Sequence, residues 1–309
     1  MLSHILSRLV RAFFTLLMVM TFAFLVLRLS GDPAIILLGP DAPQDAVEAF
    51  RNRWGLNDPL WKQYLAYISQ LLTLDFGVSM RDQVPALELV LSRIPATLAI
   101  AVPALLLKVA VGIPAGVYAA LNRQSMADRG VITLSIFGFT MPSFVLGLIL
   151  VLVFAVQLGW LPSGGQESWK HAILPIVTLS VGGIGIMARF SRSAMIEVLG
   201  QPYIRTAMAK GLSWRDVVWK HALPNASVPI VTLLGFMVGS LIAGAAVVES
   251  VFSWPGVGRL IVTAVANRDL AVVQALLLVI ASSMIVANFL VDLAYGLLDP
   301  RLRAKPAAL

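Results

Sequence analysis

The sequence has no cysteine and only three histidines, which lie far apart as His4, His171 and His221. Without cysteine, disulfides and thiolate metal sites are excluded, and histidines so scattered form no metal constellation. Charged residues are also scarce, at 13% of the chain against about 25% in soluble domains, while 59% of the residues are hydrophobic. A chain with this many hydrophobic residues cannot bury all of them in the core of one soluble domain, so we predict a membrane protein.

Several enzyme motifs are missing as well. No G-x-x-x-x-G-K-[ST] sequence and no Gly-Lys pair occurs, so the phosphate cradle of P-loop NTPases is absent. G-x-S-x-G and H-E-x-x-H are absent too. We therefore predict that the chain is not an enzyme, with no catalytic residue, no metal site and no cofactor of its own.

The formal net charge of +7 raises the question of a nucleic-acid partner. The basic residues, however, lie between apolar segments rather than on one face. We predict no nucleic-acid partner and attribute these residues to the two sides of a membrane.

Apolar runs of about 20 residues, long enough to cross about 30 Å of hydrocarbon, recur about six times. A cleaved signal peptide would have an apolar region of about 7–15 residues and a small-x-small site, which the first run lacks. The sequence therefore predicts an all-α polytopic membrane protein with about six transmembrane helices. They span about Leu9–Leu29, Pro95–Leu121, Val131–Leu158, Ala172–Phe190, Val228–Val248 and Ala271–Leu293.

Between the first two spans the chain is polar and contains turn signals. Asp45–Trp54 and Pro59–Leu74 have the pattern of amphipathic helices, and Asn57-Asp58-Pro59 is a helix start. We predict a small helical extracytoplasmic region here. The expected organisation is residues 1–29 for the N-terminus and first span, 30–94 for this outer region, 95–298 for a core with five spans and a cytoplasmic loop at 196–225, and 299–309 for a tail.

Basic residues near span ends set the orientation of a membrane protein. They concentrate at both termini and in the loop at 196–225. We therefore expect both termini and this loop to be cytoplasmic, and membrane lipid to surround the spans.

Two charged residues in or beside the spans are candidates for a translocation path. Lys108 lies near the middle of the second predicted span, where a charge is costly. Its side chain lines the translocation path, forms a structural ion pair within the protein, or extends along the span to place its ammonium at the membrane surface. Glu249 closes the fifth predicted span, where it approaches a pore mouth or is simply an interfacial carboxylate.

The small-xxx-small pair Gly112 and Gly116 predicts close helix packing.

The loop at 196–225 has the pattern of a helix–turn–helix. Tyr203–Lys210 can form a short helix, Gly211 breaks it, and Ser213 can cap a second helix over Trp214–Ala222. Pro224 is expected to stop that helix. From the residues alone, this pair either lies on lipid headgroups or docks another protein.

The same stretch resembles the "EAA" loop of bacterial ABC importer permeases. Arg205-Thr206-Ala207 occupies the E-A-A positions, Gly211 follows after three residues, and His221-Ala222-Leu223-Pro224 falls in the I-x-L-P register. The Glu, the first Ala and the Ile of the general motif are replaced. However, R-T-A-x-A-K-G-L and H-A-L-x-N-A resemble the forms of the dipeptide/oligopeptide/nickel subfamily. Segments similar to that subfamily also occur at Ser30–Pro33, Leu74–Ser79, Glu249–Arg259 and Leu298–Arg303.

This resemblance implies a type I ABC permease in the bacterial inner membrane, importing di- or oligopeptides, nickel, glutathione or another small solute. It implies as partners a homologous second permease subunit, two cytoplasmic ATPase subunits that use ATP and Mg, and an extracytoplasmic solute-binding protein. The residues expected to couple to the ATPase are Tyr203, Arg205, Thr206, Ala207, Lys210, Gly211, Trp214, Arg215, His221, Leu223 and Pro224.

Two other classes of protein are weighed against this one. An ion-coupled secondary transporter is expected to have inverted halves and intramembrane ion ligands, and neither is clear in this sequence. A membrane enzyme or membrane-anchored assembly factor needs catalytic polar groups clustered at one face, and the sequence contains no such cluster.

Overall fold

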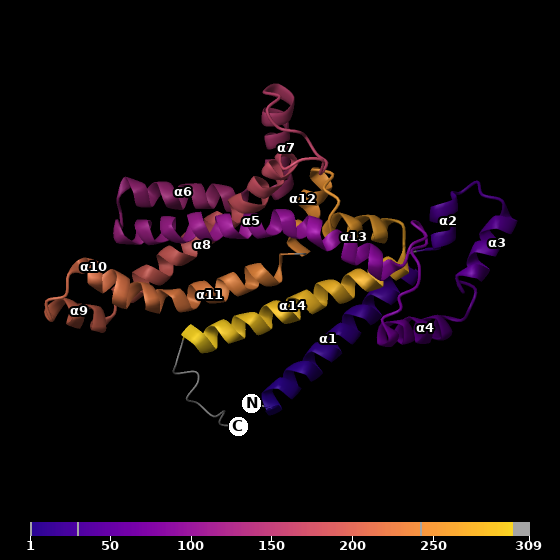
Figure 1. Ribbon diagram of the computed structural model, residues 1–309, viewed down its shortest axis with the longest axis horizontal. Coiled ribbons are helices and arrows are strands. Elements are labelled where there is room, and N and C mark those ends of the chain that lie inside the picture. The colour runs from indigo at the N-terminus through magenta and orange to yellow at the C-terminus, as the bar shows by residue number, and fades with distance from the viewer. Residues whose placement is uncertain (1, 30, 242, 299–309) are drawn as a thin grey trace. The chain divides into compact units, whose positions relative to one another are not determined.

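The computed structural model describes residues 2–29, 31–241 and 243–298, and this part of the chain is helical apart from loops and one isolated bridge between Val78 and Pro85 (Figure 1). The all-α prediction is thereby confirmed. The predicted tail at 299–309 lies outside the described residues. The helices are α1 (Leu2–Leu29), α2 (Pro33–Leu38), α3 (Gln44–Arg53), α4 (Leu60–Thr73), α5 (Ala86–Leu121), α6 (Met126–Thr140), α7 (Ser143–Leu150), η1 (Val151–Gln157), α8 (Lys170–Leu199), α9 (Pro202–Ala209), α10 (Trp214–Asp216), η2 (Val217–Ala222), α11 (Leu223–Gly239), η3 (Ala243–Ala245), α12 (Ala246–Val251), α13 (Val257–Ala266) and α14 (Leu270–Leu298).

Among the described residues, four helical stretches are long and apolar enough to cross a membrane: Ala86–Leu121, Lys170–Leu199, Trp214–Gly239 and Leu270–Ala287. The bent pair α6 and α7–η1 supplies a fifth if it forms one span. α1 adds a shorter apolar stretch over Phe13–Leu29. The two outer helices expected from the sequence appear as α3 and α4, and α2 was not expected.

The third predicted span, Val131–Leu158, is not one straight helix. Its two halves meet at 97°, at Met141 and Pro142. A proline ring disfavours helical geometry in the residue before it, and Met141 is accordingly extended, with ψ 120°. The second half ends in a π-helical turn, η1.

The fifth predicted span, Val228–Val248, also has different ends. Its helix, α11, stops at Gly239, and the separate short helix α12 follows. The intervening stretch contains Ser240 and Gly244, residues of low helix propensity. Glu249 therefore lies in α12 rather than at the end of a span.

The described residues form two compact units. The first unit comprises the residues up to Thr97 together with Pro255–Ser283, and the second comprises Leu98–Trp254 together with the residues from Met284 on. In the first unit, α4 packs on α1: the Tyr67 hydroxyl donates to the Met20 carbonyl at 3.1 Å. Met20, Phe24 and Tyr67 form a buried cluster there.

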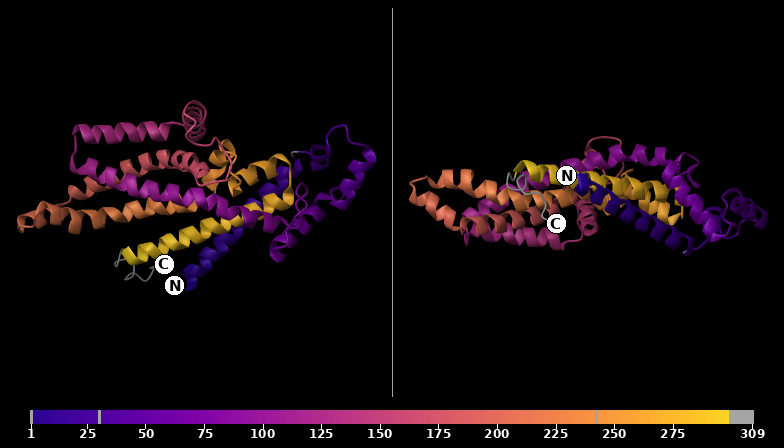
Figure 2. Two further views of the ribbon diagram at one scale, coloured as in Figure 1. Left: turned by 45° about the horizontal axis from the view of Figure 1, so that its top comes forward. Right: turned by 90° about the horizontal axis from the view of Figure 1, so that it is seen from below.

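In the second unit, α5 and α6 pack closely on α8. A Cβ atom placed on Gly112 would lie 2.7 Å from the Met187 Cβ atom, and one on Gly116 would lie 2.2 Å from the Ala188 carbonyl oxygen. The close packing expected of these two glycines is confirmed. α11 also runs beside α8, as the two views of Figure 2 show.

Candidate functional site

The predicted helix–turn–helix is present at one end of α8 and α11 in the second unit (Figure 1). Its first helix is α9, and its second begins with α10. The second helix does not stop at Pro224, so that prediction is wrong. It continues through the π-helical turn η2 into α11, giving one uninterrupted helix over Trp214–Gly239.

Helix geometry explains why Pro224 is tolerated. A proline inside an α-helix lacks the N–H donor and clashes with the carbonyl four residues earlier. Here the preceding turn is widened, because the Leu223 N–H donates to the Val218 carbonyl, five residues back. Pro224 thus lies in the first turn of α11, where a missing N–H costs little.

The turn between the two helices depends on Gly211. Its φ of +84° lies in the left-handed region, and its N–H donates to the Met208 carbonyl at 2.9 Å. Ser213 then caps the second helix, since its hydroxyl accepts from the Asp216 N–H at 3.2 Å. The predicted break and the predicted cap are both confirmed.

The inner side of the loop is apolar and packed. Ile204 and Ala207 from α9 and Val217 and Val218 from η2 are buried in one cluster with Met195 of α8. The same cluster includes residues of α5 and α11. Both loop helices are therefore fixed to membrane-spanning helices by buried side chains, and Ala207, one of the expected coupling residues, lies on this buried side rather than on the surface.

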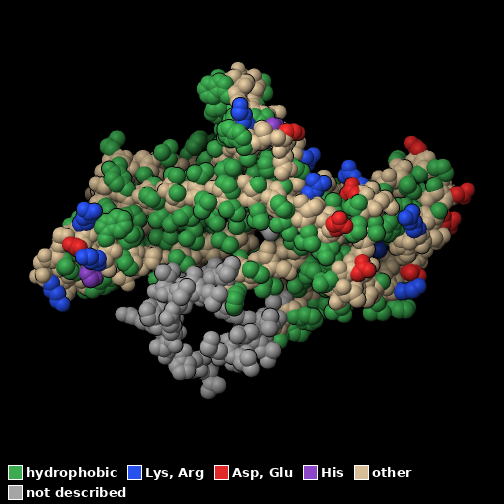
Figure 3. All heavy atoms as spheres, in the orientation of Figure 1, with side chains coloured by type: hydrophobic (Ala, Val, Ile, Leu, Met, Phe, Trp, Pro, Cys, Tyr) green, Lys and Arg blue, Asp and Glu red, His purple; other side chains and the backbone are tan. Residues whose placement is uncertain are grey.

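The outer side of the loop is basic and aromatic. Tyr203 and Trp214 are exposed, and so is Trp219, at 62%. Lys and Arg side chains gather at this end of the second unit (Figure 3). Asp216, the single acidic residue between positions 203 and 224, is already paired with Lys220 at 2.6 Å. The other expected coupling residues that are exposed are Arg205, Thr206, Lys210, Gly211, Arg215 and Pro224, while His221 and Leu223 are half-buried.

Sequence reasoning missed four exposed members of this surface. Met208, Leu212 and Trp219 are large hydrophobic side chains facing outward, and Lys220 is exposed beside them. α-Helical spacing could not have found Trp219, because five residues after Trp214 correspond to nearly the opposite face of an α-helix, and only the π-helical turn over Val217–Ala222 changes that spacing. Partial burial raises the pKa of Tyr203, so its hydroxyl stays neutral.

An ion pair between Arg192 and Asp128 joins α8 to α6 near the end of α8 that precedes the loop. The Arg192 Nε atom lies 2.5 Å from one carboxylate oxygen of Asp128, and its Nη2 atom lies 2.8 Å from the other. The Gln124 N–H donates to the same carboxylate at 2.9 Å. Asp128 is buried, and the pair joins the start of α6 to the last turns of α8.

The two candidates for the translocation path lie in different surroundings. Lys108 is half-buried on α5, and its side chain lies across Gly183 of α8, where an added Cβ atom would meet the Lys108 Cδ and Cε atoms at 2.5 Å. Within the described chain its ammonium has no hydrogen bond or ion pair. Glu249 is fully buried, so the expected interfacial carboxylate is not found.

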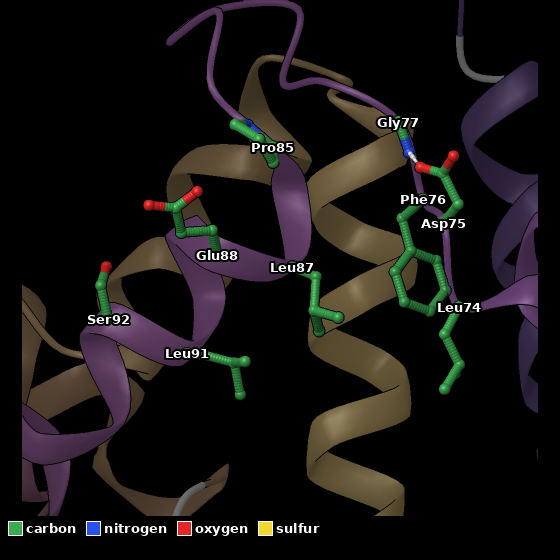
Figure 4. A pocket seen from close by; sticks show the side chains of 9 residues that line it. All are labelled: Leu74, Asp75, Phe76, Gly77, Pro85, Leu87, Glu88, Leu91 and Ser92. Carbon is green, nitrogen blue, oxygen red and sulfur yellow. Dashed lines mark hydrogen bonds between the residues drawn. The ribbon is translucent and has the colours of Figure 1, made fainter.

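The first unit has an open groove of about 630 Å³ on its surface. It lies between the segment Leu74–Gly77 and the start of α5, and its walls are mostly apolar, with Phe76, Leu87 and Leu91 among them (Figure 4). In the part of the chain that the structure describes, no group of three His, Cys, Asp or Glu side chains is placed to hold a metal ion.

Known proteins resemble this chain over nearly all of its length. The family model "Binding-protein-dependent transport system inner membrane component" matches residues 112–304, and the model of its N-terminal region matches residues 1–101. The glutathione transport system permease protein GsiC of Escherichia coli K12 is 41% identical over 306 residues, which cover 99% of this chain and 100% of that protein. GsiC of Shigella dysenteriae matches to the same extent.

A solved structure shares the fold. An inward-facing structure of the methionine ABC transporter MetNI matches with a TM-score of 0.56 and 20% identity, covering 70% of this chain and 98% of that chain. These matches favour the importer permease over an ion-coupled transporter or an enzyme. The chain belongs to the family of binding-protein-dependent transport system inner membrane components.

Proposed function

We propose that this chain is a permease subunit of an ABC importer for glutathione or short peptides. The observation that carries the substrate class is the 41% identity to GsiC over 99% of this chain and the whole of that relative. Glutathione and short peptides share a flexible backbone with free carboxylates and an ammonium group. The path through the spans must therefore accept charge of both signs.

Lys108 is the residue that we assign to this path. An ammonium group within a span needs water, an acid or a ligand, because hydrocarbon does not solvate it. Lys108 has no protein partner among the described residues, and Gly183 leaves room for its side chain. A passing substrate carboxylate would supply the missing partner. Glu249, which the sequence analysis also proposed, is enclosed by protein and is a weaker candidate.

We assign ATPase docking to the outer side of the loop between Pro202 and Pro224. Its exposed aromatic and apolar residues, Trp214 and Trp219 among them, suit a protein cleft, and aromatic side chains commonly dominate such contacts. The basic residues around them orient the encounter more than they add affinity. ATP and Mg would be bound by that partner, and the ATP would be hydrolysed there.

The continuous helix over Trp214–Gly239 supplies the link to the spans. A displacement of Trp214 in the partner's cleft would be passed along this helix and, through the buried cluster around Val217 and Met195, to α8. In this proposal both termini and the loop are cytoplasmic. The 31–94 region then faces an outer solute-binding protein, and a second, similar permease completes the path.

Transport by the reconstituted system tests this proposal. The chain would be purified with its second permease and ATPase subunits in proteoliposomes, and uptake of labelled glutathione, dipeptides and tripeptides would be measured with the binding protein outside. We expect ATP-dependent uptake of at least one of these substrates. Uptake that needs an ion gradient but no ATPase subunit would refute the importer assignment, and binding-protein-dependent uptake of nickel alone would refute the peptide assignment.

A further inference from the structure

Helix α4 in the first unit has more apolar surface than the described part of the chain covers. Its inner side packs on α1 through Tyr64 and Tyr67 (Figure 1). Trp61, Leu65 and Leu72 share a second side, because they are spaced four and seven positions apart and so recur at nearly whole turns. These three side chains are 66%, 59% and 73% exposed. A second apolar side on one helix indicates a second apolar partner.

The hydrogen bonds between α4 and α1 show at which level along α1 the helix α4 lies. The Tyr67 hydroxyl donates to the Met20 carbonyl, and the hydroxyls of Tyr64 and Thr21 lie 2.7 Å apart. Thr21 is the midpoint of the apolar stretch Phe13–Leu29, which falls within the first predicted span. Because such a stretch is embedded in hydrocarbon, a helix bonded to its midpoint lies at the level of the acyl chains rather than above the membrane.

The exposed polar side chains of α4 already have partners within the chain. The Ser69 hydroxyl donates to the Ala66 carbonyl at 2.8 Å, and the Thr73 hydroxyl donates to the Ser69 carbonyl at 3.0 Å. Lys62, the single charged residue of α4, lies in its first turn and pairs with Asp58 at 2.8 Å. Polar groups that face lipid must be satisfied by the protein, since hydrocarbon offers no hydrogen bonds. The exposed surface of α4 meets this requirement.

Helix α3, which precedes α4 in the chain, has the opposite character. None of its residues is buried, and its exposed side chains include the charged Asp45, Glu48 and Arg53. A helix of this kind belongs in water. A protein outside the membrane can dock on α3, but it cannot reach the level of Met20, to which α4 is bonded. The partner that suits the second side of α4 is therefore lipid rather than an outer protein.

We propose that α4 is embedded in the membrane, in the leaflet at the C-terminal end of α1, with Trp61, Leu65 and Leu72 in contact with acyl chains. The region between the first two predicted spans is then divided. α3 stays in water, where a binding protein can reach it, and α4 anchors the region in lipid beside α1. This inference is independent of the substrate proposed above and of the side of the membrane on which the termini lie.

Site-directed spin labelling tests the proposal, and the absence of native cysteine makes the labelling specific. A nitroxide would be attached to Leu65→Cys, to Leu72→Cys or to the control Ala49→Cys, which lies at an exposed position of α3. Each labelled chain would be purified with cysteine-free partner subunits and placed in nanodiscs. Oxygen concentrates in lipid and a neutral paramagnetic chelate stays in water, so the two relaxation agents report what surrounds the label. We expect oxygen to relax the label more than the chelate does at positions 65 and 72, and the reverse at position 49.

Three other outcomes would overturn the proposal. If the chelate dominates at positions 65 and 72 as it does at 49, the second side of α4 faces water. If the chelate reaches the label only until the solute-binding protein is added, that side is a docking surface for this protein. If neither agent reaches the label, another subunit covers the helix. Two positions on α4 are labelled so that, if one variant does not assemble, the other decides.

Discussion

The guanidinium of Arg192 binds both carboxylate oxygens of Asp128, at 2.5 Å and 2.8 Å, and this pair connects α6 to the part of α8 that leads into the loop between Pro202 and Pro224. The carboxylate is buried, and the Arg192 side chain is 20% exposed. A paired, bidentate contact holds its two helices in one geometry more firmly than a single hydrogen bond does. A movement of α8 imposed from the loop would therefore carry the start of α6 with it.

We predict that Asp128→Asn destabilises the protein by about 3 kcal/mol, because removing one partner of a buried pair leaves the other charge uncompensated. The thermal unfolding midpoint in detergent measures this effect. Arg192→Gln should give a similar loss, and the double variant should lose less than the sum of the two single variants. Additive losses would show that the two side chains act independently.

The exposed pair Lys220–Asp216 supplies the control for that experiment. Its two side chains are largely solvated, and surface pairs of this kind contribute little to stability. Asp216→Asn should therefore leave the unfolding midpoint nearly unchanged. If coupling depends on the Asp128–Arg192 pair, ATPase activity in proteoliposomes should persist in Asp128→Asn while uptake per ATP falls.

Gly211 tests the turn between the loop helices. No atom lies within 4 Å of a Cβ atom built on Gly211, so a side chain would meet no steric obstacle there. The positive φ is the constraint, and we predict that Gly211→Val strains the turn by about 1–3 kcal/mol and uncouples ATP hydrolysis from uptake. Co-purification of the ATPase and uptake per ATP are the measurements.

Gly211→Asn separates backbone strain from side-chain size. Asparagine tolerates the left-handed region better than valine does, so this variant should keep most of the coupled uptake. Equal loss in both variants would show that the surface at this position, rather than the turn geometry, matters to the partner.

Local signals allowed much of this structure to be predicted from the sequence. The apolar runs located the long apolar helices, although not the bend at Pro142 or the end of α11 at Gly239, because lipid-exposed backbone satisfies its hydrogen bonds within helices. Gly211 and Ser213 marked the turn and the cap, since each acts within its own few residues. Helices α3 and α4 followed from their amphipathic pattern, and α4 also from the helix start at Asn57-Asp58-Pro59.

The failures lie where structure depends on contacts between distant residues or on a departure from α geometry. The sequence predicts that the helix ends at Pro224, and only the widened turn at η2 shows why the helix continues. Asp128 and Arg192 are 64 positions apart, so no local pattern links them.

The role of Lys108 can be tested through transport. Lys108→Met keeps the length of the side chain but removes its charge, so a substrate carboxylate would lose its partner. We predict an increase in the KM for uptake of about tenfold or more, with basal ATPase activity retained. Gly183→Ala should give a milder effect in the same direction, because its Cβ atom would displace the Lys108 side chain. Unchanged uptake in Lys108→Met would remove this residue from the path.

Asp269 gives the protein a specific pH dependence. Its buried carboxylate accepts from the Ser79 hydroxyl at 2.6 Å, which joins the segment before α5 to the start of α14 within the first unit. Burial raises the pKa of Asp269, and the hydrogen bonds from Ser79 and from the Arg81 and Val272 N–H groups only partly oppose this. The folded protein therefore holds this proton more tightly than the unfolded chain does. The resulting stabilisation is full below the ordinary carboxyl pKa of about 4 and is lost as the pH rises through the raised value.

We predict that Asp269→Asn, which cannot ionise and still offers an oxygen to Ser79, removes this dependence. The difference in unfolding free energy between variant and wild type should change with pH by at most about 1.4 kcal/mol per unit, in favour of the variant as the pH rises above about 4. Chemical unfolding across this range measures the slope. Asp82→Asn, at an exposed position nearby, should follow the wild-type curve. Parallel curves for Asp269→Asn and wild type would mean that Asp269 binds its proton equally in both states, which would contradict the effect assigned to its burial.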